Sequence, residues 1–408
     1  MTALASPRAL PVLGPDLRGP APFRDLCTDC GVSRTSAPER CGQVCQFIHP
    51  QYPALEQQAH GRARDEARED EALFGPYLEM SRARLRAPRP GAQWTGITTR
   101  IGERLLEAGL VDAVIATAAD PDDRWRPRPV LVRTAAGMQA CRGMKMGYSP
   151  VLALLDQAAR EGLTRLAVIG VPCQVHALRA LEPTLGLLRL YVIGTPCSDN
   201  TTTEHFHDFL ARVSAAPDRV TYCEFQPDLH LELRYDDRPT ERIPFLRLPI
   251  ADLPADFFPL TCRSCFDYAN ALADVTVGYM AGEGDQWLVV RNARGRELAT
   301  LLGGELETRP LGTAGRRGAG VRGYLANLML AANGLPVRRA PRWLRPLLAW
   351  VMPRFGPRGL EFARARVEMK LLEGITTLRR HRPRRVARLV PAFAWRVARR
   401  YGLVVEPN

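Results

Sequence analysis

The chain has 408 residues, of which 46% are hydrophobic and 24% charged, a composition typical of a globular protein long enough for two domains. We expect no secretory signal at its start, and no run of about 18 apolar residues predicts a membrane-spanning helix. The net charge is +13, and residues 341–408 alone hold 16 Lys or Arg against four Asp or Glu. Such a basic segment attracts acidic proteins, nucleic acid or anionic lipid, and composition does not choose among them.

The expected elements of the first half alternate between helix and strand after a different beginning. Proline-rich residues 1–22 predict a flexible arm, residues 23–50 predict turns, and residues 54–86 predict helix from their Glu, Arg and Ala. Hydrophobic periodicity then predicts helices over 97–108, 151–161 (with Ser149 as N-cap), 174–181 and 202–213, and strands over 111–116, 130–133, 166–171 and 188–193.

The second half changes from alternation to hairpins and then to a basic tail. Residues 220–225, 229–235 and 241–246 predict antiparallel strands, and 274–279 and 287–291 predict two further strands, whereas 294–302 and the segment from 343 onward predict helix. The fold class is therefore mixed α/β (α+β). The expected regions are an arm at 1–22, a cysteine-containing N-terminal region at 23–90, a core in two parts at 91–162 and 163–335, and a basic helical tail at 336–408.

Eight of the ten cysteines fall into two sets of four. The first set is compact, with the spacing Cys-x2-Cys-x10-Cys-x3-Cys, and comprises Cys27, Cys30, Cys41 and Cys45. Four thiolates suit a 4Fe–4S cluster or a structural zinc ion, and this spacing leaves both open. A reducing cytoplasm is the compartment in which such thiols remain available to metals.

The second set is dispersed along the chain. Cys173 and Cys197 each follow an apolar strand and a proline, and Cys262 and Cys265 form a Cys-x2-Cys pair. Because parallel strands end at the same edge of a sheet, we expect Cys173 and Cys197 to lie near one another. Burial as ordinary core residues is the alternative for these two, and is our interpretation of Cys141 and Cys223.

Four contiguous motifs make the chain similar to a known family. They are residues 26–31 (LCTDCG), 91–96 (GAQWTG), 194–202 (GTPCSDNTT) and 264–280 (SCFDYANALADVTVGYM). Over roughly residues 23–335 the chain resembles the flavin and iron–sulfur family of the deazaflavin-reducing hydrogenase β subunit. Within it, the chain resembles the branch that acts on chlorophyll-type pigments. One departure is Val32-Ser33-Arg34, which stands where the family has a second Cys-Gly-type continuation.

The resemblance implies an oxidoreductase with FAD and two 4Fe–4S clusters that takes electrons from ferredoxin. It makes 23–90 an N-terminal iron–sulfur region, 91–162 the N-terminal part of a flavin-binding core, and 163–335 a catalytic and iron–sulfur domain. The short, tryptophan-containing segment 278–287 (GYMAGEGDQW) favours reduction of the 8-vinyl group of 3,8-divinyl (proto)chlorophyllide a to ethyl, a step of chlorophyll or bacteriochlorophyll synthesis. Reduction of 7-hydroxymethyl chlorophyll a, or of a deazaflavin, is the alternative within the family. The pigment substrate is a tetrapyrrole, and the resemblance leaves room for a homo-oligomer.

We expect the flavin to lie among polar side chains near these motifs, and no Gly-x-Gly-x-x-Gly fingerprint competes with them. The candidates are Thr95, Gly96, Thr99, Lys145, Ser149, Gln174, Thr195 and Asn200. Helix capping is the alternative for Thr95 and Ser149, and a solvated surface position is the alternative for Lys145.

Proton donors and partners complete the expectations. Asp199, Asp267 and Tyr148 adjoin the motifs and are candidate acids, with turn capping as the alternative for Asp267. The basic tail suits acidic ferredoxin or an anionic membrane surface, where Trp343, Leu347, Leu348, Trp350 and Phe355 would fit an interfacial helix, and a solvated helical face is the alternative. A zinc-stabilised nucleic-acid-binding protein is the hypothesis from another class, and we expect no nucleic-acid partner because no recognised binding module is present.

Overall fold

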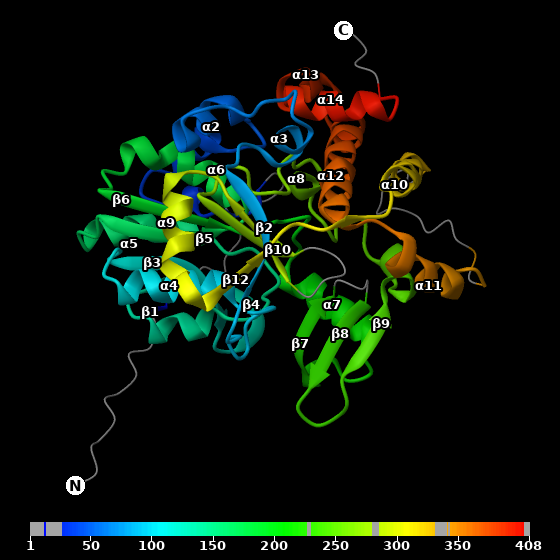
Figure 1. Ribbon diagram of the computed structural model, residues 1–408, viewed down its shortest axis with the longest axis horizontal. Coiled ribbons are helices and arrows are strands. Elements are labelled where there is room, and N and C mark those ends of the chain that lie inside the picture. The colour runs from blue at the N-terminus through cyan, green and yellow to red at the C-terminus, as the bar shows by residue number, and fades with distance from the viewer. Residues whose placement is uncertain are drawn as a thin grey trace.

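The computed structural model describes residues 12–13, 27–226, 230–279, 285–330, 341 and 343–403. In these residues, nine strands form a central sheet with helices on both faces (Figure 1). The order across the sheet is β1 (Val12–Leu13), β4 (Asp123–Val132), β3 (Ala113–Asp120), β5 (Arg165–Gly170), β6 (Arg189–Gly194), β10 (Val275–Tyr279), β11 (Gln286–Val290), β2 (Glu79–Leu85) and β12 (Leu306–Arg309).

The middle of this sheet is parallel and its two sides are antiparallel. Strands β3, β5, β6 and β10 run in one direction. Strand β4 lies antiparallel to β3, and β11, β2 and β12 continue antiparallel from β10. Helical crossovers produce the parallel centre, and the mixed α/β class expected from the sequence is confirmed.

Neighbouring residues of the central strands enter two different cores, because side chains alternate between the faces of a sheet. Ile193 packs with α4 (Ile97–Glu107) and α9 (Ala293–Leu302) on one face. Val192 belongs to the core of the other face, to which α2 (Tyr52–His60), α5 (Leu154–Arg160), α6 (Pro172–Leu181) and α12 (Leu360–His381) contribute. Burial on both faces explains the continuous apolar sequences of β5 and β6.

A smaller antiparallel sheet lies beside the main one with its own core (Figure 1). It consists of β7 (Val220–Phe225), β8 (His230–Tyr235) and β9 (Glu241–Pro244), which pair as their alternating sequences predict. Helix α7 (Thr203–Val213) contributes Phe206, Phe209 and Leu210 to the same hydrophobic cluster.

Two local predictions are wrong. Residues 54–86 are not one helical region, because α2 and α3 (Glu69–Phe74) are followed by strand β2, where pairing with β11 and β12 overrides the helix-favouring composition. Ser149 does not cap the next helix, since its hydroxyl lies 2.8 Å from Thr117 Oγ1 and α5 begins at Leu154. Apart from β1, the arm expected over 1–22 lies outside the described residues.

Most of the 22 residues of helix α12 are buried. Arg317 forms ion pairs with Glu361 and Glu368 of this helix, and Arg364 pairs with Asp70. Part of the positive charge of the C-terminal region is therefore neutralised inside the fold, so a wholly solvated helical tail is wrong for α12.

The remaining C-terminal elements surround α12 or lie beyond it. Helices α10 (Gly318–Leu330), α13 (Val386–Leu389) and α14 (Ala392–Arg400) pack against α12, as does the short pair β13 (Thr313–Ala314) and β14 (Arg358–Gly359). Helix α11 (Arg345–Phe355) lies at the outer edge of the molecule (Figure 1). Of the helices in the described residues, none combines the length and the apolar character needed to cross a membrane.

Candidate functional site

The carboxyl ends of β5 and β6 bring two of the cysteine loops together. The strands are parallel and in register, with Gly170 opposite Gly194. Pro172-Cys173 follows the first strand and begins α6, and Pro196-Cys197 follows the second. The predicted meeting of Cys173 and Cys197 at one edge of the sheet is therefore confirmed.

The side chain of Asn270 joins these two loops through hydrogen bonds. Its Nδ2 donates to the carbonyl oxygen of Gly170 at 2.8 Å and to that of Thr195 at 3.2 Å. A Cβ on Gly194 would lie 2.6 Å from Asn270, so glycine is required for the close approach. Asn270 itself has a φ of 55°, a left-handed conformation that asparagine tolerates better than most residues.

The inner thiol set comprises Cys197, Cys262 and Cys265 around this edge. Cys262 lies on the short helix α8 (Leu260–Arg263), and the backbone N–H of Cys265 donates to the Cys262 carbonyl at 3.0 Å. The backbone N–H of Cys197 donates to Tyr268 O at 3.1 Å, which ties the strand-end loop to the Cys-x2-Cys segment. Cys262 and Cys265 are both buried.

The outer thiol set comprises Cys27, Cys30, Cys41 and Cys45, all partly exposed. These residues lie on turns and on the short helix α1 (Cys41–Val44), and the Cys30 carbonyl accepts a hydrogen bond from Leu152 N at 3.0 Å. Gly31 has a φ of 107°, and a Cβ there would lie 2.5 Å from the backbone of Ala153. Glycine thus lets the outer segment lie directly against the flavin-binding core expected from the sequence.

Cys173 is an electrostatic neighbour of both the outer and the inner set. Burial raises the pKa of the thiols in both sets. A charge on Cys173 raises the pKa further for six of them, which are Cys27, Cys30, Cys45, Cys197, Cys262 and Cys265. Gln46 adds a direct link, because its Nε2 donates to Cys265 Sγ at 3.5 Å. The eight thiols therefore form one continuous region.

The thiols of this region are free, and no disulfide joins them. Within the described parts of the chain, no three His, Cys, Asp or Glu side chains converge to hold a single metal ion. The sulfur atoms lie in one region without meeting at a single point. This arrangement does not by itself distinguish a 4Fe–4S cluster from a structural zinc ion.

Helix α12 places a charged cluster beside the inner thiol set, and sequence reasoning missed it. Lys370 Nζ donates to Asp199 Oδ1 at 2.6 Å and to Glu373 Oε2 at 3.2 Å. Burial alone would lower the pKa of Lys370, but the two carboxylates raise it well above its usual value. Burial raises the pKa of Glu373 to about 7. Spacing was the available signal, because Arg366, Lys370 and Glu373 at i, i+4 and i+7 share one helix face.

The candidate acids occupy three different environments. Asp199 is bound by Lys370, as described. Both carboxylate oxygens of Asp267 accept the Ala271 N–H, at 3.1 and 3.0 Å, so Asp267 caps this turn, and burial raises its pKa. Tyr148 is partly buried in the loop before Ser149. Of the three, only Asp199 belongs to the charged cluster beside the inner thiols.

The predicted flavin residues on the strand-end loops lie at the same edge of the sheet. Gln174 Nε2 donates to the Ser149 carbonyl at 2.7 Å, and Asn200 Nδ2 donates to the Gly147 carbonyl at 2.7 Å. Thr195 N–H donates to the Gly170 carbonyl at 3.1 Å. These contacts join the loops after β5 and β6 to the loop before α5.

The remaining flavin candidates surround the start of α4. Thr95 Oγ1 donates to Gln286 Oε1 at 2.9 Å and accepts from Leu85 N at 3.1 Å, so helix capping is the wrong interpretation of Thr95. Gly96 is the N-cap, without a side-chain cap, and Thr99 is buried on the helix. Lys145 Nζ turns inward to the carbonyls of Arg142 and Gly143, and burial lowers its pKa to about 8.

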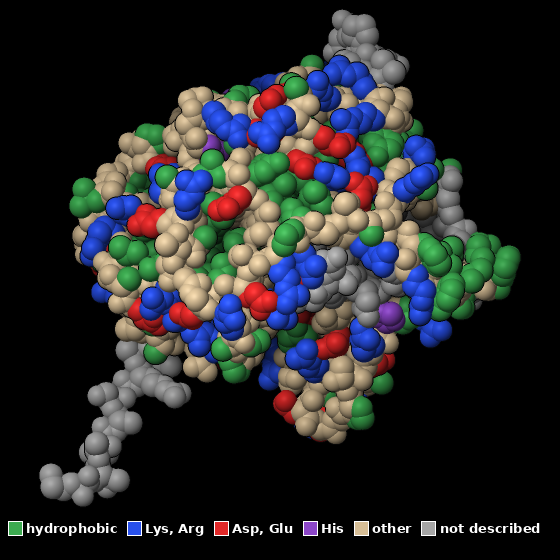
Figure 2. All heavy atoms as spheres, viewed as in Figure 1, with side chains coloured by type: hydrophobic (Ala, Val, Ile, Leu, Met, Phe, Trp, Pro, Cys, Tyr) green, Lys and Arg blue, Asp and Glu red, His purple; other side chains and the backbone are tan. Residues whose placement is uncertain are grey.

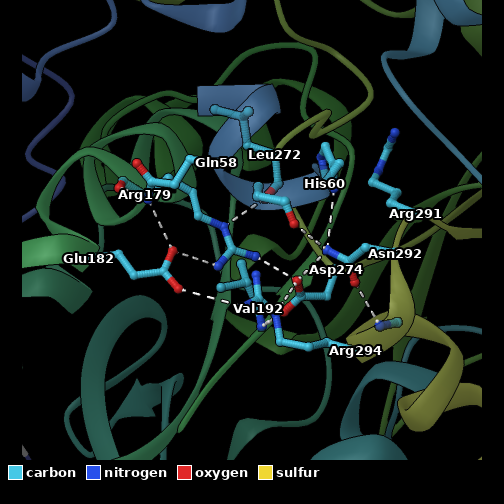
Figure 3. A network of polar contacts seen from close by, with 12 residues as sticks. Gln58, His60, Arg179, Glu182, Val192, Leu272, Asp274, Arg291, Asn292 and Arg294 are labelled. Carbon is cyan, nitrogen blue, oxygen red and sulfur yellow. Dashed lines mark hydrogen bonds and ion pairs between the residues drawn. The ribbon is translucent and has the colours of Figure 1, made fainter. Parts of the chain in front are cut away.

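A buried ion pair fixes the segment behind the inner thiols (Figure 3). Arg179 of α6 donates to Asp274 Oδ1 at 2.7 Å, and both side chains are fully buried. Asn292 and Arg294 also donate to Asp274, and the Val192 N–H donates to its Oδ2 at 2.7 Å. The helix that begins at Pro172-Cys173 is thereby held to the segment that runs from Cys265 to β10.

Comparisons with known proteins agree with this architecture. Residues 80–156 match the N-terminal part, and residues 163–313 the C-terminal part, of the coenzyme F420 hydrogenase/dehydrogenase beta subunit. An uncharacterized protein of Nostoc sp. is 38% identical over 99% of this chain and 100% of its own length. The chloroplastic 7-hydroxymethyl chlorophyll a reductase of Oryza sativa subsp. japonica is 37% identical over 94% of this chain and 84% of its own length.

A solved structure has the same fold over the core. A chain of the F420-reducing NiFe hydrogenase complex from Methanosarcina barkeri superposes with a TM-score of 0.52 and 24% identity, covering 60% of this chain and 85% of that chain. This similarity concerns the fold alone. With both family parts matched and relatives similar along nearly its whole length, the chain belongs to the coenzyme F420 hydrogenase/dehydrogenase beta-subunit family.

Proposed function

We propose that this protein is a ferredoxin-dependent reductase of a chlorophyll-type pigment, and that it reduces the 8-vinyl group of 3,8-divinyl (proto)chlorophyllide a to ethyl. Family membership and the rice relative support reduction of such a pigment. The observation that carries the proposal is the continuous region of eight free thiols at the carboxyl edge of the sheet. Such a region suits the transfer of single electrons from a protein donor to a second cofactor.

The thiol region fits two 4Fe–4S clusters. In a cubane each cysteine binds a different iron atom, so four sulfurs that are neighbours without converging on one point are suitable ligands. Burial makes the bare thiolates unfavourable, raising the pKa of Cys27 to about 11 and that of Cys45 to about 12. Cationic iron would offset this cost, since metal binding stabilises the deprotonated ligand.

Cys27, Cys30, Cys41 and Cys45 would hold the first cluster, and Cys173, Cys197, Cys262 and Cys265 the second. The electrostatic proximity of Cys173 to both sets supports short electron steps between them. The family assignment does not support the alternative of a zinc-stabilised nucleic-acid-binding protein.

The loops around α4 and the strand ends fit FAD. Gly96 begins α4 without a side-chain cap, which leaves backbone N–H groups suited to a pyrophosphate. Trp94 stacks on Tyr279 with ring centroids 5.4 Å apart at this same edge. We propose that Thr95, Gly96, Thr99, Lys145, Ser149, Gln174, Thr195 and Asn200 hold the cofactor. A bound flavin would accept electrons singly and deliver them as a pair.

The charged cluster on α12 is a candidate proton reservoir. Reduction of a vinyl group to ethyl consumes two electrons and two protons. Glu373 Oε2 and Asp199 Oδ1 both lie within hydrogen-bond distance of Lys370 Nζ. A proton held by Glu373 near neutral pH is available for transfer, because general acids work best with a pKa near the working pH.

Reduction of 7-hydroxymethyl chlorophyll a is the second candidate, favoured by the rice relative at 37% identity. The feature that favours the vinyl substrate is the short segment 278–287, of which residues 280–284 lie outside the described residues. Trp287 of that segment is buried in the core and packs on Phe74 with ring centroids 4.9 Å apart. Its presence therefore has a structural reason that is independent of the substrate.

The decisive assay is a comparison of substrates. Protein purified without oxygen would be incubated with reduced ferredoxin and one of four substrates, and the products separated chromatographically. The substrates are 3,8-divinyl chlorophyllide a, divinyl protochlorophyllide a, 7-hydroxymethyl chlorophyll a and a deazaflavin. We expect the monovinyl products from the first two. Turnover of the hydroxymethyl pigment alone would establish the second candidate, and reduction of a deazaflavin alone would overturn both.

A further inference from the structure

Helix α11 and its surroundings carry an exposed apolar patch. The exposed fractions are 79% for Trp343, 55% for Leu347, 52% for Trp350 and 66% for Phe355. Figure 2 shows the corresponding hydrophobic surface projecting at the edge of the molecule where Figure 1 places α11. Large apolar side chains gathered in this way mark a site of interaction, whereas isolated ones do not.

Neighbouring elements enlarge this patch, which we call the α11 patch. Helix α11 packs against the turn Phe245–Arg247 of the small sheet, and Phe245 is itself exposed and lies 6.3 Å from Phe225 between ring centroids. Apolar surface of the α11 patch thus comes from two segments of the chain.

The segment that carries α11 has charge of one sign. Residues 343–360 contain three arginines and no acidic residue. Arg354 lies over the Trp350 ring, 4.5 Å from its centroid, and donates to the Trp350 carbonyl at 2.9 Å. Arg345 begins the same helix. A partner of this surface therefore has to be negatively charged and at the same time accept aromatic and aliphatic side chains.

An anionic lipid surface meets both conditions. Tryptophan and phenylalanine favour the boundary between head groups and acyl chains, and arginine keeps its charge at the phosphates while its stem lies along apolar surface. With eleven residues, α11 is far shorter than the roughly 20 that a membrane-spanning helix needs. We propose that the α11 patch docks this protein on the surface of an anionic bilayer, with α11 lying in the interface.

The position of α10 gives docking a consequence for the site. Tyr324 of α10 is an electrostatic neighbour of Glu373 and Asp199, whose charges raise its pKa beyond the effect of burial. The same helix packs against α12 and ends in the exposed Met329 and Leu330, after which the chain leads to α11. Helix α10 therefore connects, along the chain, the surroundings of the charged cluster to the segment that would dock. Docking itself does not depend on the proposed pigment reduction.

The test is flotation of the full-length, cofactor-loaded protein with lipid vesicles. One set of vesicles is phosphatidylcholine alone, and the other contains equal parts of phosphatidylcholine and phosphatidylglycerol. We expect flotation with the anionic vesicles only, weakened by salt, and a blue shift of tryptophan emission that brominated acyl chains quench. The double variant Trp343→Ser/Trp350→Ser should bind about tenfold more weakly or worse.

Controls separate docking from other effects. Leu188→Ser changes a side chain that is 80% exposed before β6, away from α11, and should bind vesicles like the unchanged protein. Arg345→Gln/Arg354→Gln should lose the preference for anionic lipid while keeping the apolar side chains. Absence of flotation, or equal binding by the tryptophan variant, would overturn the proposal. The proposal would also be overturned if the unchanged protein bound no vesicles but sedimented as a dimer, and the tryptophan variant sedimented as a monomer.

Discussion

The outer and inner thiol sets have the same chemistry in different surroundings. Cys27, Cys30, Cys41 and Cys45 are partly exposed on turns, and the neighbouring Asp29 is paired with Arg34. Cys262 and Cys265 are buried, and a charged lysine, Lys370, lowers their pKa values against the larger effect of burial. All four members of the outer set, but only Cys197 of the inner set, are partly exposed, so access to a protein donor is greater at the outer set.

This difference suggests a direction for electrons. A cationic neighbour stabilises the reduced, more negative state of a cluster and raises its reduction potential, whereas an anionic neighbour lowers it. Arg34 pairs with Asp29 beside the outer set, and Asp199 opposes Lys370 at Cys197 and Cys262 of the inner set, so a direction from outer to inner rests on the greater exposure of the outer set. The outer cluster would accept electrons from ferredoxin, and the inner one would pass them towards the flavin.

Removal of one ligand from each set should have the largest effect. We expect Cys262→Ser to lower the iron content from about eight to about four per chain and to abolish turnover, since the inner cluster is lost. Cys41→Ser should also halve the iron but leave the inner electron paramagnetic resonance signal. Iron analysis and spectra of both variants would check this, and full iron content in both would contradict the assignment of ligands.

Loss of the buried ion pair should destabilise the inner region. Asp274→Asn would remove the fully buried partner of Arg179, which keeps only the more exposed Glu182, and loss of one member of a buried pair costs about 3–5 kcal/mol in comparable cases. The midpoint of thermal unfolding should fall clearly, and cluster loss should begin at the inner signal. As a matched control, Arg84→Gln breaks the surface pair with Glu307, worth about 0–1 kcal/mol. Equal shifts in the two variants would refute this expectation.

Glu373 should make the inner region sensitive to pH. Its folded-state pKa is raised to about 7 from an ordinary 4.5, so the protonated side chain stabilises the fold. That contribution is complete below about pH 4.5 and is lost as pH rises through about 7. Glu373→Gln should therefore reduce the fall in thermal midpoint between pH 5 and pH 8. The corresponding loss in free energy of unfolding over this range should be smaller by roughly 1–3 kcal/mol. An unchanged pH profile would count against a protonated Glu373.

Replacement of Lys370 should change the midpoint potential of the inner cluster only, and this is the smallest effect among these predictions. Lys370→Met removes a positive charge, and we expect the inner midpoint potential to fall by on the order of 60 mV, a tenfold change for a one-electron couple. Lys370→Arg should restore most of it. Arg364→Met, on the same helix but paired with Asp70, is the control. Redox titration would check this, and an equal shift of both clusters would remove the contrast between them.

The elements that could be predicted from the sequence are those with local signals. The apolar runs of β5 and β6, each ending in Pro-Cys, predicted both the strands and their meeting at one edge. Thr202 caps α7 through the His205 N–H, as a threonine before an amphipathic helix indicates. Strand β2 was missed because its identity depends on pairing with β11, which is distant in sequence.

The candidate site was predicted only where its residues lie in motifs. The eight thiols were found by spacing and resemblance, but nothing local showed that Cys173 would be an electrostatic neighbour of both sets. Lys370 and Glu373 were missed because a basic segment usually indicates solvent exposure, and their burial depends on packing between α12 and the rest of the fold. Trp287 was associated with the substrate, although the core accounts for its presence.

Metal, sulfide and flavin analysis of protein purified without oxygen tests the central claim most directly. The account predicts a brown protein with about eight iron atoms, about eight acid-labile sulfides and one FAD per chain. Zinc bound in place of iron, with no sulfide and no flavin, would contradict it.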